Sequence, residues 1–372
     1  MPPAIIMPSA TRHQPPLPAG SCVPVGIAGL NFGRHIIDQL TAGDGAAWLR
    51  VAAVCDLDAA KAAAMAERLG GGVRAFDDLQ KLIDAPGIPA IGLFTGPAGR
   101  ASLIRRIIRA GKDVITTKPF ETDPDAALAV LREARALGRV VHLNSPAPLP
   151  APDIAQIERW RVEYDLGAPV GARADVWASY RETADGSWYD DPGRCPAAPI
   201  FRLGIYLVND LVRLFGPVAD AHVMQTRLFT GRPTPDNAQL SLRFENGALA
   251  GIFASFCVND GDHYRNGLTL NFENGTLYRN LGPARGDAGK SELALVQLRD
   301  GARRVVARAE VAGGSGAYQW ETFARAVRRE PFAGAESSAT TPEQVAAGLR
   351  VIQMMSRQPG GFPPIGRRPV AP

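Results

Sequence analysis

The chain has 372 residues, of which 46% are hydrophobic and 21% are charged, so it is long enough to form two globular domains. The formal net charge is +4 and no Lys/Arg-rich block occurs, which argues against nucleic acid as a partner. No apolar run reaches about 18 residues and the four scattered cysteines lack metal-site spacing, so we expect no membrane span and no metal centre in a reduced, cytoplasmic protein.

Both ends of the chain are expected to lie outside the folded domains. Residues 1–22 contain many prolines and no basic stretch leading into an apolar one, which predicts a disordered tail and not a secretory signal. Residues 358–372 are rich in glycine and proline and predict a second disordered tail.

The segment from residue 23 to residue 145 alternates strands with helices. Short apolar runs predict buried strands at Val23–Ala28, Val51–Cys55, Ala90–Phe94, Val114–Thr116 and Val140–Leu143. Helices are predicted between them, with the first opening at His35–Leu40. Repeated βα units of this length predict a doubly wound parallel sheet, that is, a Rossmann domain.

The rest of the ordered chain, residues 146–357, does not continue the alternation of strands and helices. Four prolines between residues 146 and 152 predict a stiff linker and a domain boundary. Turn signals at Asn246-Gly247, Asn274-Gly275 and Asp300-Gly301 predict hairpins, hence an α+β domain with a large, mainly antiparallel sheet. Helices at Tyr318–Arg329 and Pro342–Ser356 are predicted to close the chain.

A phosphate-binding turn is predicted after the first strand, at Gly29-Leu30-Asn31-Phe32-Gly33. Gly29 would allow the tight turn, and Gly33 would let the backbone approach a pyrophosphate at the helix N-terminus. Asn31 replaces the second glycine of the usual motif, and asparagine tolerates positive φ better than most residues. The alternative is an ordinary strand-to-helix turn.

Three further positions are predicted to bind the same dinucleotide. Asp56 ends the second strand, where a carboxylate accepts hydrogen bonds from the adenosine ribose. Because that carboxylate would repel a 2′-phosphate, NAD is favoured and NADP is the alternative. Thr95 and Pro97 would lie under the pyrophosphate–nicotinamide stretch. The competing interpretation of Asp56 is a helix cap, a role that Asp58 could also fill.

Lys118 stands at the carboxyl end of a predicted strand, just before Pro119, which has no backbone N–H to continue the sheet. Ligands of open α/β sheets bind at that edge. An ammonium there could polarise a carbonyl or help to take a proton from an alcohol, and it would also contact the cofactor. The alternative is a solvated loop lysine.

A polar stripe is predicted on the apolar helix Phe201–Phe215. Its members recur at helical spacing and are Arg202, Tyr206, Asn209 and Arg213. If the stripe faces the cleft, Tyr206 exchanges a proton, Asn209 orients a hydroxyl, and Arg202 attracts a carboxylate or anchors the helix. Trp188-Tyr189, in the preceding loop, would form an apolar wall for a sugar ring. A solvated helix face is the alternative.

In this order and spacing, the glycine turn, Asp56, Thr95-Gly96-Pro97, Thr117-Lys118-Pro119 and the segment Leu203–Asn209 resemble the Gfo/Idh/MocA family of nicotinamide-dependent oxidoreductases. The resemblance covers about residues 23–357. It implies hydride transfer between NAD(P) and a hydroxyl or carbonyl of a sugar, cyclitol or sugar-acid-like substrate. It also implies an open sheet used for homodimer or homotetramer contacts.

The chain departs from the family pattern at several positions. Thr117 replaces the glutamate before the lysine, and Arg100 stands where a histidine often follows the fourth strand. Tyr206 occupies a position that is often histidine, as in the glucose–fructose oxidoreductase branch. Arg202 replaces an acid, which favours an anionic substrate. We expect Tyr206 to act as general acid/base, with its pKa depressed by Lys118. A non-catalytic dinucleotide-binding regulator of the same fold is the alternative.

Overall fold

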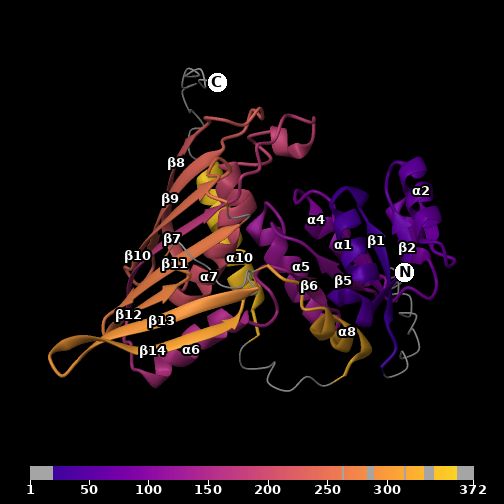
Figure 1. The fold of residues 1–372 in the computed structure, drawn as a ribbon. Coiled ribbons are helices and arrows are strands. Elements are labelled where there is room, and N and C mark those ends of the chain that lie inside the picture. The colour runs from indigo at the N-terminus through magenta and orange to yellow at the C-terminus, as the bar shows by residue number, and fades with distance from the viewer. Residues whose placement is uncertain (1–19, 262–263, 283–288, 314–315, 331–338, 358–372) are drawn as a thin grey trace, which may run out of the picture.

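Two β-sheets form the frame of the molecule, and helices lie between and around them (Figure 1). The computed structural model describes residues 20–261, 264–282, 289–313, 316–330 and 339–357. Most of the first predicted tail and all of the second lie outside these residues. The predicted fold class, a Rossmann sheet joined to an α+β half with a large sheet, is confirmed.

The first sheet is parallel throughout, with strand order β3-β2-β1-β4-β5-β6. Its strands are β1 (Val23–Ala28), β2 (Leu49–Cys55), β3 (Arg74–Phe76), β4 (Ala90–Leu93), β5 (Asp113–Thr116) and β6 (Val141–Leu143). The central strands β4 and β5 are buried at every position because helices cover both faces. The chain order reverses between β1 and β4, and ligands of such sheets bind at this switch point.

The helices of this half start where the sequence provides a cap. They are α1 (Leu30–Ala42), α2 (Ala59–Leu69), α3 (Leu79–Asp84), α4 (Arg100–Arg109) and α5 (Pro124–Ala136). The carboxylates of Asp58, Asp78 and Asp123 accept hydrogen bonds from amides in the first turns of α2, α3 and α5. Helix α1 begins at Leu30, earlier than predicted, because Gly29 makes the whole turn by itself.

The second sheet has the strand order β14-β13-β12-β11-β7-β10-β9-β8. Its strands are β7 (Pro169–Trp177), β8 (Val218–Thr226), β9 (Asn237–Phe244), β10 (Leu249–Ser255), β11 (Arg265–Phe272), β12 (Gly275–Arg279), β13 (Lys290–Arg299) and β14 (Ala302–Ala312). All neighbours are antiparallel except β7 and β10. The three predicted hairpin turns join β9 to β10, β11 to β12 and β13 to β14, which confirms them.

Helices cover one face of this sheet and leave the other open (Figure 1). The covering elements are α6 (Pro152–Glu163), a π-helical turn (Ile200–Gly204), α7 (Ile205–Phe215) and α10 (Pro342–Ser356). Helix α7 inserts Leu207, Leu211 and Phe215 into the shared core. On the sheet, Met224 and Leu249 are exposed at 72% and 60% of their surface.

Helix α8 (Trp320–Arg328) crosses back to the first half of the molecule. Trp320 and Phe323 pack there with Val25 and Ile37 of the Rossmann core. The sequence indicates a helix here but not its packing partner, because an amphipathic pattern defines only an apolar face. The domain division at residue 145 therefore stays a prediction.

None of the helices in the described ranges combines the length and hydropathy that a bilayer crossing requires. All four cysteines are free thiols, and three of them are buried.

Candidate active site

A cleft of about 1070 Å³ lies where the carboxyl ends of β1, β4 and β5 face α7 and the loop after β7. Most predicted site residues line it: Gly29, Asn31, Phe32, Asp56, Thr95, Pro97, Lys118, Trp188, Arg202 and Tyr206. Gly33 and Asn209 do not. Tyr189, which was predicted with Trp188, also lines the cleft, as do Tyr180 and Tyr264, which no sequence pattern marked.

Gly29 makes the turn that brings α1 to the cleft. Its φ is 87°, and a Cβ at this position would lie 2.9 Å from the Phe94 carbonyl carbon, so only glycine fits. Asn31 lies in the first turn of α1 without positive φ, so the expected left-handed conformation is wrong. Gly33 is buried with its Cβ position 3.0 Å from Ile27, so it serves helix–strand packing and does not face the cleft.

The Asp56 carboxylate lies between the glycine turn and α2. It accepts hydrogen bonds from the Leu30 amide at 2.8 Å and the Asp58 amide at 3.1 Å, and the Lys61 ammonium lies 3.4 Å away. Burial opposes ionisation, but these hydrogen bonds and the Lys61 charge hold the pKa of Asp56 below its ordinary value. Asp58, not Asp56, caps α2.

Arg100 and Glu121 connect the loops that follow β4 and β5 under the cleft, a role that the sequence pattern does not indicate. The buried Arg100 guanidinium donates to the carbonyl oxygens of Thr95, Thr117, Pro119 and Phe120. Glu121 accepts from the amides of Gly99 and Ala101 at the start of α4. In the sequence, these residues are visible only as charged positions next to apolar segments, and that pattern does not indicate their hydrogen-bond partners.

The Lys118 ammonium points into the cleft from the end of β5. It donates to the main-chain carbonyl oxygen of Arg202, and its backbone amide donates to Asn144 Oδ1 at 2.9 Å. Burial, with a smaller contribution from the Arg202 charge, lowers the pKa of Lys118 to about 7. The amine can therefore hold or release a proton near neutral pH.

Tyr206 faces Lys118 across the cleft from α7. The Lys118 Nζ lies 4.7 Å from the centroid of its ring, over the face and not beside the hydroxyl. Burial raises the pKa of Tyr206 well above its ordinary value, and the nearby phenols of Tyr264 and Tyr318 act in the same direction. The expectation that Lys118 depresses this pKa is wrong, and Tyr206 is a neutral phenol at physiological pH.

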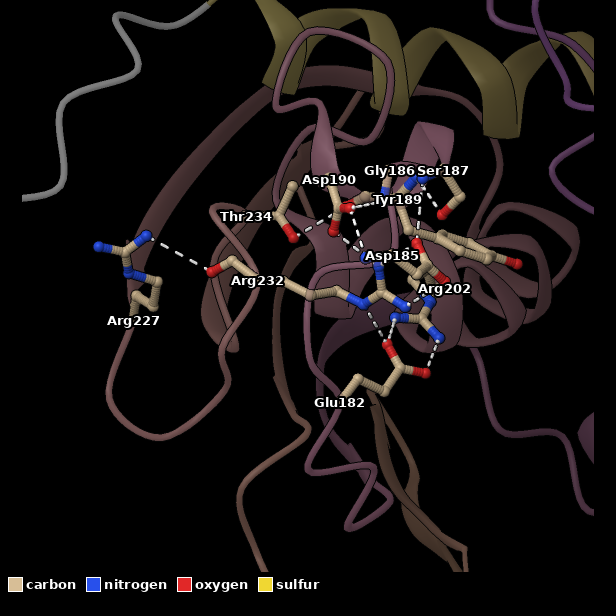
Figure 2. A network of polar contacts seen from close by, with 10 residues as sticks. All are labelled: Glu182, Asp185, Gly186, Ser187, Tyr189, Asp190, Arg202, Arg227, Arg232 and Thr234. Carbon is tan, nitrogen blue, oxygen red and sulfur yellow. Dashed lines mark hydrogen bonds and ion pairs between the residues drawn. The ribbon is translucent and has the colours of Figure 1, made fainter.

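Arg202 belongs to a network of ion pairs in the wall of the cleft (Figure 2). Its guanidinium makes two hydrogen bonds to Glu182, at 2.7 and 2.8 Å, and stacks 4.2 Å from the ring centroid of Tyr189. Arg232 binds the same Glu182 at 2.8 Å and also Asp185 and Asp190. Arg202 keeps its charge but is already paired with the Glu182 carboxylate, which contradicts the expectation that it attracts a carboxylate of the substrate.

The loop that this network holds carries Trp188 across to the first half. The indole Cδ1 lies 3.6 Å from the Cβ position of Gly96 in the turn after β4, and its ring lies 4.0 Å from that of Tyr189. Asn209, in contrast, is buried and donates to Ser145 Oγ at 3.0 Å. It connects α7 to the chain after β6 and lies too far inside to orient a substrate hydroxyl.

Two protein-family models match the chain. One is described as an oxidoreductase family with an NAD-binding Rossmann fold and matches residues 23–145. The other is the Gfo/Idh/MocA C-terminal domain and matches residues 154–278. The chain belongs to the Gfo/Idh/MocA oxidoreductase family. It is an NAD(P)-dependent oxidoreductase, and the resemblance that its motifs indicated is confirmed.

Three solved structures share the fold at 15%, 19% and 17% sequence identity. GenD2 from gentamicin A biosynthesis, in complex with NAD, is 15% identical, with 91% of this chain and 95% of that one covered and a TM-score of 0.65. The UDP-N-acetylglucosamine 3-dehydrogenase GnnA from Acidithiobacillus ferrooxidans is 19% identical, with coverage of 90% and 97% and a TM-score of 0.61. KijD10, a 3-ketoreductase from Actinomadura kijaniata in complex with TDP-benzene and NADP, is 17% identical, with coverage of 90% and 96% and a TM-score of 0.61. Comparison with curated protein sequences gave no match.

The residues of the cleft fit a nicotinamide dinucleotide. The N-terminus of α1 meets the cleft directly after Gly29, where backbone amides attract a pyrophosphate. Asp56 directly follows β2, at the place where a carboxylate would accept hydrogen bonds from an adenosine ribose. The cleft volume of about 1070 Å³ slightly exceeds the range for single small-molecule sites, about 300–1,000 Å³, which suits a dinucleotide with a second ligand beside it.

Proposed function

We propose that this oxidoreductase oxidises a hydroxyl group, or reduces the matching carbonyl, of an uncharged sugar or cyclitol. The observation that carries the proposal is the Lys118 ammonium, which lies with a pKa of about 7 in the same cleft as the Gly29 turn. A group that titrates near the working pH is the most effective proton donor and acceptor.

Lys118 would move the proton of the reacting hydroxyl. In the oxidative direction its neutral amine accepts that proton while the carbinol carbon loses a hydride. When bound, the nicotinamide supplies the hydride acceptor or donor. In the reductive direction the Lys118 ammonium returns the proton to the carbonyl oxygen. Tyr206, held as a neutral phenol, would donate a hydrogen bond to the same oxygen, so we propose both as catalytic residues.

The walls of the cleft favour an uncharged substrate with an apolar ring face. Tyr180, Trp188 and Tyr189 supply aromatic surface to the cleft. Among the described residues that line the cleft, both arginines are engaged, Arg100 by carbonyl oxygens and Arg202 by Glu182. The name of GnnA gives UDP-N-acetylglucosamine as its substrate, which agrees with a sugar ring at the reacting end, although that substrate also carries a charged diphosphate.

A spectroscopic screen tests the proposal. The purified protein is mixed with NAD or NADP and with neutral sugars, cyclitols and sugar acids, and absorbance in the reduced-nicotinamide band is followed. We expect turnover with a neutral member and a loss of about 10²–10⁴-fold in Lys118→Met, with dinucleotide binding retained. Lys81→Met, at an exposed lysine paired with Asp77, is the control. Full turnover by Lys118→Met, or a strict preference for sugar acids, would contradict the proposal.

We also propose that the protein forms a homodimer or homotetramer through the open face of the second sheet. Met224 and Leu249 leave exposed apolar surface there. Light scattering on the wild type and on a Met224→Lys/Leu249→Lys variant tests this, since the variant should dissociate. A monomeric wild type would overturn it.

A further inference from the structure

Asn144 directly follows β6 and is 4% exposed. Strand β6 pairs with β5 in a register that places Leu143 opposite Thr116, which brings Asn144 beside the segment that carries Lys118. We propose that Asn144 is a positioning residue, whose side-chain amide fixes Lys118 and Tyr206 relative to each other and directs the phenol proton of Tyr206 at the reacting oxygen. The inference rests on the proposed function, because it assigns how these two residues are held for that reaction.

The oxygen of the Asn144 side chain faces Lys118. Asn144 Oδ1 accepts hydrogen bonds from the Lys118 amide at 2.9 Å and from the Thr117 hydroxyl at 3.4 Å. A backbone N–H can only donate, so the oxygen of the side-chain amide, and not its nitrogen, must lie on this side. The contact fixes the backbone from which the Lys118 side chain extends into the cleft.

The nitrogen of the same side chain faces Tyr206. Asn144 Nδ2 donates to the Gly316 carbonyl oxygen at 3.0 Å, and a Cβ at Gly316 would lie 3.1 Å from the Tyr206 phenol oxygen. A hydrogen bond between Asn144 and the phenol opposes the rise in the pKa of Tyr206 that burial causes, as a bond donated to the phenol oxygen does. Since Nδ2 carries two hydrogens, one serves Gly316 and the other serves Tyr206.

This hydrogen bond decides what the Tyr206 phenol can do. A phenol oxygen that accepts a hydrogen bond directs its own O–H at another acceptor, and it donates more strongly because linked hydrogen bonds polarise one another. In the proposed reaction that acceptor is the oxygen of the substrate hydroxyl or carbonyl. The adjacent residue attaches the same segment to α7, since Ser145 Oγ accepts from Asn209 at 3.0 Å, about one turn beyond Tyr206.

Double-mutant cycles with Tyr206→Phe test this role. Asn144→Asp keeps an acceptor for the Lys118 amide but replaces the donor to Tyr206 with a second acceptor, and Asn144→Ala removes the amide without adding a charge. Kinetics use the neutral sugar or cyclitol that the screen turns over fastest, with kcat taken on the plateau of its pH profile. Each substitution should lower kcat by about 10- to 100-fold and change KM by less than about threefold. Neither should lower kcat further when Tyr206 is already phenylalanine.

Asn246→Asp is the matched control for these variants. The Asn246 side chain also bridges two backbone groups, accepting from the Ala248 amide at 3.1 Å and donating to the Phe215 carbonyl oxygen at 2.8 Å. It does so in the turn between β9 and β10, outside the cleft, so kcat should not change. Thermal melts of each variant verify that the fold is retained.

Raman spectroscopy of the purified protein supplies a second readout that needs no substrate. The tyrosine doublet reports whether a phenol accepts or donates a hydrogen bond, and subtracting the spectrum of the matching Tyr206→Phe protein isolates Tyr206 from the other tyrosines. We expect an accepting phenol in the wild type and in Asn246→Asp. The phenol should become a strong donor in Asn144→Asp and should lose the accepted bond in Asn144→Ala.

The outcomes separate this inference from the proposed function. Additive losses of kcat in the cycles, or a Tyr206 doublet that is the same in the wild type and in Asn144→Asp, would overturn the inference and leave the oxidoreductase intact, because Asn144 would then serve only the fold. A wild type that turns over no neutral probe overturns the proposed function instead. The Raman comparison then decides alone whether Asn144 directs the phenol.

Discussion

The ammonium of Lys118 lies 4.7 Å above the ring of Tyr206 and donates its hydrogen bond to the Arg202 carbonyl oxygen, not to the phenol. The sequence predicted that Tyr206 exchanges the proton while Lys118 depresses its pKa, but this arrangement does not couple the two groups in that way. Burial lowers the pKa of the amine to about 7 and raises that of the phenol. The residue that titrates is Lys118, and Tyr206 keeps its proton.

The pH dependence of turnover should follow Lys118. In the oxidative direction kcat/KM should rise with pH and level off above about 7, because only the neutral amine accepts a proton. In the reductive direction it should fall above about 7. Arg202→Gln removes a positive charge that lowers this pKa, so its profile should shift to higher pH. A profile without an inflection near neutrality would contradict the assignment.

Gly316 should be irreplaceable for a reason that involves Tyr206. Its φ is 91°, and a Cβ there would lie 2.5 Å from Tyr206 Cε1. Gly316→Ala should therefore displace the ring, reducing kcat and lowering Tm. Gly247→Ala is the matched control, because its φ is 89° and its Cβ position is open. The free energy of unfolding of the control should fall only by the cost of placing an alanine in the left-handed backbone conformation, about 1–2 kcal/mol. Equal losses of activity in both variants would exclude the contact with Tyr206 as the cause.

Arg232 should be important for both stability and substrate binding. Its buried guanidinium holds Glu182, Asp185 and Asp190 together beneath the loop that carries Trp188. Arg232→Met leaves these acids without that partner, and we expect the free energy of unfolding to fall by about 2–3 kcal/mol. This is less than the loss for a fully buried ion pair, because Asp185 is half exposed.

The substrate KM should rise more than kcat falls in Arg232→Met, because the aromatic wall loses its support while Lys118 stays in place. Arg243→Met, at an exposed arginine 3.8 Å from Asp220, should change neither parameter. Urea unfolding and steady-state kinetics on the two variants measure the difference, and an unchanged KM would show that the network does not position the loop.

Local patterns predicted the elements that present the site. Apolar runs located five of the six Rossmann strands, and β3 escaped because it has three residues, begins with Arg74 and is only partly buried. The segment Pro342–Ser356 carries a Thr341–Gln344 capping box, which explains why its predicted bounds agree with the structure.

Interactions between distant segments could not be predicted. Arg202 was given a substrate role because its partner Glu182 lies on a loop with no periodic relation to α7. The pKa of Tyr206 depends on burial under Gly316 and on other tyrosines that only the fold brings together. Residue spacing predicts which side chains share a helix face. It does not predict which charged or polar groups from distant segments lie beside those side chains.

The stability of the fold should fall as the medium becomes mildly acidic, and His142 on β6 should be one cause. It is 1% exposed beside the Phe323 ring, and burial lowers its pKa to about 3. Histidine in the unfolded chain titrates near 6.5, so below that pH the unfolded state binds the extra proton. The stabilisation by neutral His142 is fully present above about pH 6.5, and the free energy of unfolding decreases by about 1.4 kcal/mol for each pH unit below that value.

Urea unfolding of the wild type should therefore give a free energy of unfolding that is lower at pH 5 than at pH 7.5, with about 2 kcal/mol of the difference due to His142. The His142→Leu variant should lack this part of the difference. The comparison is made as the difference between the two pH values within each protein, so the change in packing that leucine causes at either pH cancels. His222→Gln, at an exposed histidine, is the control and should retain the loss of the wild type. If the leucine variant loses as much stability as the wild type between these pH values, protonation of His142 is not the cause.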